Sequence, residues 1–161
     1  MILLSNIVTA IADRLKTSYP LAQVFSEQVS VTGEHECFFI GIEQVKADIV
    51  LFDRRKYVCS FDLTCLAPKI DPTEKNGLDL YCFGAKVMDL LEYITVDGDV
   101  LRLQNRRMKR KNAERRIQGM TMHGESELHI YFDIELFAAQ DDNVFEQMER
   151  LDMEVANGNI Y

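Results

Sequence analysis

The chain has 161 residues, of which 47% are hydrophobic and 27% charged, a balance typical of globular proteins and not of disordered ones. A chain of this length is expected to form one domain over residues 1–161 and to bury about 70% of its extended surface. The net charge of −8 argues against general affinity for nucleic acids. No window approaches the roughly 20 apolar residues of a membrane-spanning helix, so no membrane partner is expected.

The charges are distributed unevenly along the chain. Residues 106–116 contain seven basic residues and one acidic residue, a net charge of +6, so the remainder carries −14. Such a run could engage phosphates in salt-dependent contacts, but it contains no interleaved aromatic residue for base stacking. Three interpretations stay open: an exposed β-hairpin that offsets an acidic body, a docking surface for an acidic partner or the next subunit, and direct nucleic-acid contact.

Neither the cysteines nor the N-terminal segment indicates secretion. The four cysteines follow no zinc or redox spacing and lie in apolar segments, so we interpret them as reduced core residues of a cytosolic protein. They are Cys37, Cys59, Cys65 and Cys82. The first fifteen residues lack a positively charged start and a small-residue cleavage site, and are expected to form a helix of the mature protein.

Helical periodicity predicts three helices. The first covers residues 3–17 and cannot continue past Pro20. The second covers residues 78–94 and is apolar around much of its circumference. Its outer row, which includes Tyr81 and Met88, is expected either to lie beneath a loop or second helix or to meet a neighbouring subunit. The third follows the helix cap Asp141-Asp142 and, with a frayed tail, occupies residues 142–161.

Alternating and β-branched segments predict the strands. The clearest is 127–137, in which apolar residues at even positions alternate without a break with polar or aromatic ones. Others are expected at 23–31, 37–42 and 57–65, with either a short strand or a loop at 49–52. A further strand is expected to start at 100–103 and enter the basic run, with Ile117, Met120 and Met122 on its returning partner. A turn at 123–125 would then lead into the long strand.

This order of elements predicts an α+β domain. An overlong strand with one apolar face needs antiparallel neighbours on both sides and helices over that face. We therefore expect an antiparallel or mixed β-sheet of five to six strands, with two or three helices packed on its apolar face.

The sequence offers little for catalysis. Its three histidines are scattered at positions 35, 123 and 129 without metal-ligand spacing, and no nucleophile, phosphate-binding or dinucleotide motif is present. Asp133 and Glu135 share one strand face, an ordinary arrangement on a solvated sheet. We therefore expect that the protein is not an enzyme and has no catalytic, metal-binding or cofactor-binding residues. A small metal-dependent enzyme stays as an alternative that elemental analysis of pure protein would dismiss.

Several segments together resemble the tail terminator, or tail completion, family of tailed bacteriophages and phage-tail-like particles. The first helix ends at Tyr19-Pro20 and is followed by an acid-then-CFFI strand at 36–40. An aromatic-rich strand at 57–66 stops near Pro68. A helix ending DLLEYI at 89–94 precedes the long strand at 128–137. The resemblance covers residues 2–138. The basic run departs from it, being longer and more basic than the family pattern.

The resemblance implies a structural subunit that forms a ring, usually a hexamer, on the head-proximal end of the tail tube. Such a ring stops tube polymerisation and offers a surface to the head connector, sheath or collar protein. The implied partners are further copies of the chain, the tube protein and that connecting protein, with DNA only passing through the lumen. The implied location is the host bacterial cytoplasm during assembly and the particle afterwards.

An interface is expected on two parts of the chain. One is the basic run, with Arg106, Arg107, Lys109, Arg110, Lys111, Arg115 and Arg116; the other is the outer row of the second helix, with Tyr81 and Met88. The alternative function is a nucleic-acid-binding accessory protein that acts through the basic hairpin at 106–116.

Overall fold

The computed structural model describes residues 2, 4–26, 36–51, 54–66, 77–117 and 120–139, except the side chains of residues 51, 77–79, 112–126 and 139. The two helices are α1 (Leu4–Ser18) and α2 (Gly77–Leu90). The strands are β1 (Gln23–Phe25), β2 (Cys37–Leu51), β3 (Arg54–Leu66), β4 (Tyr93–Val96), β5 (Asp99–Arg102), β6 (Gln104–Ile117) and β7 (Met120–Ala139).

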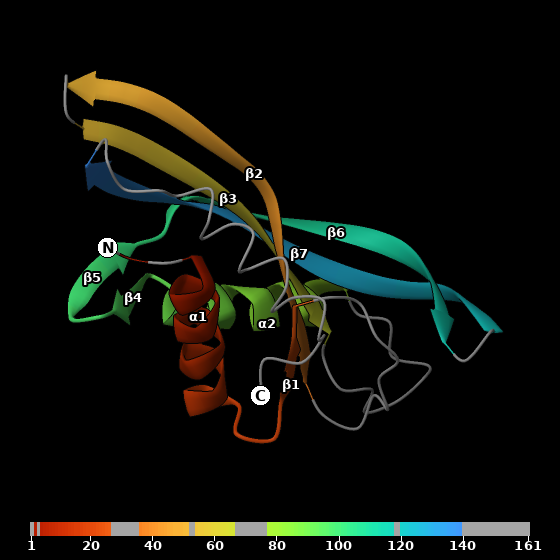
Figure 1. Cartoon of the computed structure of the whole chain (residues 1–161). Helices are drawn as coiled ribbons and strands as arrows, with labels where there is room; N and C mark the ends of the chain where they lie inside the picture. Colours follow the sequence, from red (N-terminus) through yellow and green to blue (C-terminus); the bar gives the residue numbers. More distant parts are fainter. Residues whose placement is uncertain are drawn as a thin grey trace.

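Five of these strands form one mixed sheet in the order β1-β2-β3-β7-β6, and β4 and β5 form a separate hairpin. β1 runs parallel to β2, and the other neighbours are antiparallel. Both helices and the β4–β5 hairpin lie on one side of the sheet (Figure 1). The predicted α+β class, with an antiparallel or mixed sheet of five to six strands, is therefore confirmed.

The core lies between the helices and the inward face of β2, β3 and β7. On β3 and β7 the inward residues are almost completely buried, and the Phe61 and Phe132 rings stack with centroids 5.3 Å apart. Tyr19, just after α1, packs against Phe38 of β2 and Phe83 of α2, with ring centroids 5.6 and 5.7 Å away. Three elements distant in the sequence thus meet around one aromatic ring.

α2 approaches the sheet closely at Gly84. A Cβ atom there would overlap Leu128 Cδ2 and lie 2.8 Å from Met108 Sδ. Only glycine lets the helix backbone reach this distance from β6 and β7. At the end of α2, the Arg14 side chain of α1 donates a hydrogen bond to the Leu90 carbonyl, 3.0 Å away.

Three predicted strands are shorter than the strands observed in the structure. The long strand predicted at 127–137 begins already at Met120, so the turn predicted at 123–125 is wrong. The strand predicted at 37–42 continues to Leu51 as β2. A register shift between Ile42 and Gln44 breaks its alternation, so the sequence showed no clean period there. The strand predicted at 57–65 begins at Arg54.

Other predicted boundaries also need correction. α2 ends at Leu90, and residues 93 and 94, assigned to the helix, begin β4. The strand expected to run from 100–103 into the basic run is divided into β5 and β6. Asn105, with φ of 52°, turns the backbone just inside β6, and asparagine tolerates this left-handed region. Of the strand predicted at 23–31, residues 23–25 are observed. The helix predicted at 142–161 lies outside the described residues.

Candidate interaction surfaces

The basic run lies on β6, at the outer edge of the sheet. Arg107, Lys109 and Lys111 stand opposite Tyr131, His129 and Glu127 of β7. Because successive strand residues point to opposite faces, these three cations share the face away from the helices, while Arg110 lies on the helix side. All four are exposed. The basic run therefore places positive charge on both faces of the sheet at this edge.

Two of these cations are held by an aromatic ring. The Arg107 guanidinium carbon lies 5.0 Å and the Lys111 ammonium nitrogen 5.4 Å from the centre of the Tyr131 ring. Hydrogen bonding to Tyr131 is the main influence that raises the pKa of Lys111. Cation–π contacts of this kind order long side chains without removing their charge.

The other predicted interface residues have different surroundings. Arg106 is half-buried and donates a hydrogen bond to the Met88 carbonyl of α2, 2.8 Å away. The Met88 side chain packs against the core, whereas Tyr81 is exposed. Arg115 and Arg116 continue β6, and their side chains lie outside the described set. Arg106 and Met88 thus already contact each other within the subunit.

A buried polar cluster lies beside the cations, on the same face. His129 Nδ1 is 2.8 Å from Asp62 Oδ1, and His129 Nε2 is 3.1 Å from Glu127 Oε2. Residues His129 and Glu127 are only 7% and 3% exposed. The His129 ring also stacks on Tyr131, with centroids 6.0 Å apart. The cluster therefore connects β3 and β7 to the cations of β6.

Further polar contacts continue along this face. Asp133 accepts hydrogen bonds from Ser60 at 2.7 Å and from Asn105 at 2.9 Å. Lys56 and Glu135 form an ion pair at 2.6 Å. Acidic side chains on β3 and β7 are thus paired locally on this face.

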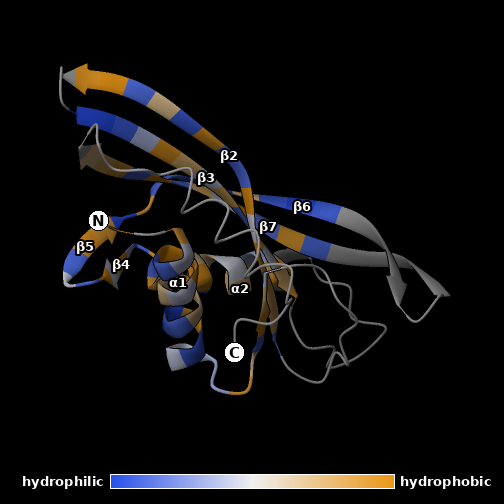
Figure 2. Cartoon of the chain, viewed as in Figure 1, coloured by the Kyte–Doolittle hydropathy of each residue, from blue (hydrophilic) through white to orange (hydrophobic). Residues whose placement is uncertain are grey.

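A groove opens at the other end of the sheet, on the helix side. It has a volume of about 520 Å³ and lies between the start of α1, the β4–β5 hairpin and the far ends of β2, β3 and β7. Most of its lining is apolar, including Leu101 and Leu136, and Asp97 and Asp99 stand at the hairpin side. Ile49, near this end of β2, is 78% exposed. Figure 2 shows hydrophobic residues at this free end of β2.

Sequence reasoning found some of these residues and missed others. The alternation in β7 placed Glu127, His129 and Tyr131 on one face, and that placement is correct. Asp62 could join them only through the register between β3 and β7, which no local pattern reveals. The groove was missed for the same reason, because its lining comes from five separate elements.

The described part of the chain shows no group of three or more His, Cys, Asp or Glu side chains arranged to hold a metal ion. The two carboxylates at His129 occupy opposite ring nitrogens, so they cannot share one ion with it. Of the helices described, neither is long and apolar enough to cross a membrane.

A family model described as phage tail terminator protein matches residues 6–146. The chain belongs to the phage tail terminator family. The match includes the mixed sheet, both helices and the β4–β5 hairpin. No match to this chain is found among the curated proteins.

Membership of this family gives the chain a structural role in completing the tail, as a component of the virion. The family is one of structural proteins, not enzymes, and its members interact with tail and head components.

Proposed function

We propose that this chain forms a ring, a hexamer, on the head-proximal end of the tail tube, where it ends tube polymerisation. The ring presents its outer surface to a head connector, or to a sheath or collar protein. It assembles in the cytoplasm of the host bacterium, and DNA passes through its lumen. The family match over residues 6–146 carries this proposal.

The two open edges of the sheet, on β2 and β6, support a ring. Among the described residues, β1 covers only residues 37–39 of β2, so the edge of β2 from Gly41 onward is open, and so is the outer edge of β6. An open strand edge presents unpaired backbone groups to a partner. The two edges also differ, because β6 is basic while the free end of β2 is apolar. Contacts between unlike patches of identical copies form rings when the rotation closes.

The test is electron microscopy of particles from cells in which this gene is deleted, with tube length scored. We expect tubes of abnormal length, restored to normal by the wild-type gene. Tubes of normal length that fail only to join heads would replace termination with a connector role. Normal particles, fully joined, would overturn the proposal.

A second candidate function is nucleic-acid contact through β6. Arg107, Lys109 and Lys111 are exposed on one face, which is the arrangement that a phosphate backbone would need. A mobility shift that persists at about 150 mM salt would support this function, because non-specific contacts weaken steeply with salt.

A further inference from the structure

The β6–β7 hairpin projects from the body as a two-stranded arm. β3 accompanies β7 only as far as Leu128, which pairs with Cys65. Beyond it, residues 111–117 of β6 pair with residues 120–127 of β7, and no third strand among the described residues joins them. Figure 1 shows this arm extending past the other strands. An isolated two-stranded hairpin is marginally stable in water, so a partner surface is needed to order the arm.

The end of the arm has a distinct composition. Residues 115–122, called the arm tip below, contain two arginines and no acidic residue. They also contain Ile117, Met120 and Met122. Methionine side chains adapt to irregular apolar surfaces. The arm tip therefore suits an apolar surface with acidic residues beside it.

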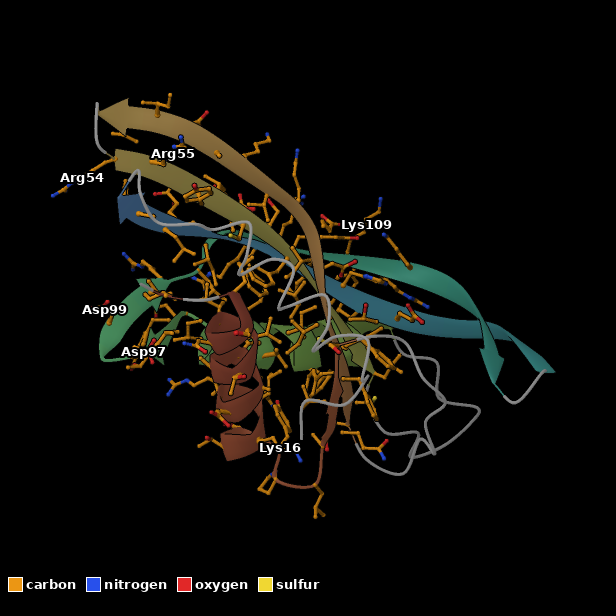
Figure 3. The ribbon with its side chains drawn as sticks, viewed as in Figure 1. Lys16, Arg54, Arg55, Asp97, Asp99 and Lys109 are labelled. Carbon is orange, nitrogen blue, oxygen red and sulfur yellow. The ribbon has the colours of Figure 1, made fainter. Side chains whose placement is uncertain are left out.

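The groove at the opposite end of the sheet has these properties. Val100, Leu101 and Leu136 line it, and Val100 is 66% exposed. Asp97 and Asp99 stand on its β4–β5 side, and Figure 3 shows both at the left edge of the molecule, well away from Lys109 of β6. The groove thus combines exposed apolar surface with negative charge.

The arm tip cannot reach the groove of its own subunit. β7 contributes to both and runs without interruption from Met120 at the tip to Leu136 in the groove. At about 3.3 Å per residue, these ends are separated by roughly 50 Å along the strand. An arm tip in this groove must come from a second copy of the chain.

We propose that the arm tip of each copy occupies the groove of the next copy. The arm acquires the surface that it lacks in the isolated subunit, and the exposed Val100 is covered. Two different patches meet, so the contact is of the head-to-tail kind that closes into a ring. This inference rests on the proposed ring and names the surfaces that form it.

The first test uses complementation in the deletion strain, with Val100→Asp as the groove variant and Leu21→Asp as its matched control. Leu21 is an aliphatic side chain 68% exposed, compared with 66% for Val100, and lies in the segment after α1, away from the groove. Both changes are at exposed positions, so both proteins are expected to fold. We expect Val100→Asp to leave tube length as abnormal as the deletion does, and Leu21→Asp to restore normal length.

The outcomes of this test separate the two proposals. Normal tubes in the deletion strain itself would overturn the proposed function. Abnormal tubes in the deletion strain, with full restoration by Val100→Asp, would overturn the groove contact and leave the proposed function standing.

A proximity measurement identifies the occupant. In a Cys82→Ser background, Val100→Cys and Met120→Cys are combined, and purified particles are treated with a short bismaleimide. We expect a ladder of covalent multimers on a denaturing gel, and none when Leu21→Cys replaces Val100→Cys. A ladder in both or in neither would overturn the inference. A missing ladder combined with a defective Val100→Asp variant would mean that something other than the arm tip fills the groove.

Discussion

His129 has a carboxylate oxygen within hydrogen-bonding distance of each ring nitrogen. A neutral imidazole has one N–H group, so it could donate to only one of Asp62 and Glu127 and would turn a lone pair toward the other. The imidazolium form donates to both and balances part of their charge. Replacement of this ring would remove a hydrogen-bond partner from the buried Glu127 carboxylate, which costs free energy.

The four thiols are expected to differ sharply in reactivity. Cys37, Cys59 and Cys65 are buried, whereas Cys82 is exposed, so the sequence-based assignment of all four to the core is wrong for Cys82. Burial raises the pKa of Cys59 to about 11 and raises that of Cys65 as well. Since the thiolate is the reactive form, we predict that native protein at pH 8 reacts rapidly through Cys82 alone.

The measurement is maleimide labelling followed by mass spectrometry, in native buffer and in denaturant. Wild-type protein should gain one label in native buffer and four in denaturant. The Cys82→Ser variant should gain no label in native buffer and three in denaturant. Rapid native labelling of a second cysteine would show that the sheet opens far more readily than its burial implies.

At the scale of elements, the contact between α2 and the sheet depends on Gly84. We predict that Gly84→Ala destabilises the protein by about 1–3 kcal/mol, because the new methyl group overlaps the buried Leu128 side chain and must displace it. Alanine's better helix propensity, about 1 kcal/mol, offsets only part of this cost. Chemical denaturation measures the change.

Lys86→Ala is the control, because Lys86 is exposed on the same helix. Its effect on unfolding free energy is expected to stay within about 0.5 kcal/mol. Equal stability of Gly84→Ala and wild type would mean that α2 can move away from β7 without a loss of unfolding free energy.

The elements predicted correctly are those whose own residues carry the pattern. α1 has a complete apolar stripe, and its predicted bounds differ from the observed ones by one residue at each end. Apolar residues at the even positions 128–136 alternate without interruption, so this part of β7 was predicted correctly. β4 was missed because Ile94 continues the helical spacing of α2, although the chain has already turned after Leu91. The returning strand at Met120 and Met122 was predicted, but its continuation into the long strand was missed because Gly124 suggests a turn, whereas β7 runs through a register shift there.

The candidate site was predictable to a smaller extent. The basic run is visible as composition, and β6 does place it at the edge of the sheet. Which cations point together depends on the register with β7, and the inward turn of Arg106 to the Met88 carbonyl depends on the position of α2. Such facts arise from tertiary packing and leave no local trace in the sequence.

For the whole molecule, the role of the basic edge can be tested by charge reversal. We predict that Arg107→Glu, Lys109→Glu and Arg110→Glu together weaken association with the ring or tube by about tenfold or more, because an acidic partner would then be repelled. The control reverses three exposed cations away from both sheet edges: Arg54, Lys86 and Arg102. Sedimentation of mixed components measures association.

The control carries the same change in net charge, so it separates a local contact from a general effect of charge. Unchanged assembly with the β6 variant would remove the docking role of the basic run. Equal losses in both variants would assign the effect to the overall field of the protein.

β7 belongs both to the arm and to the centre of the sheet, and this has a mechanical consequence. Twelve residue pairs join it to β3 without a register shift. A pull on the arm along the strand axis loads this ladder in shear, so the backbone hydrogen bonds resist together and do not open one after another. Tension from a neighbouring subunit is therefore transmitted into the core of the molecule, where the Phe61–Phe132 stack and both helices resist it.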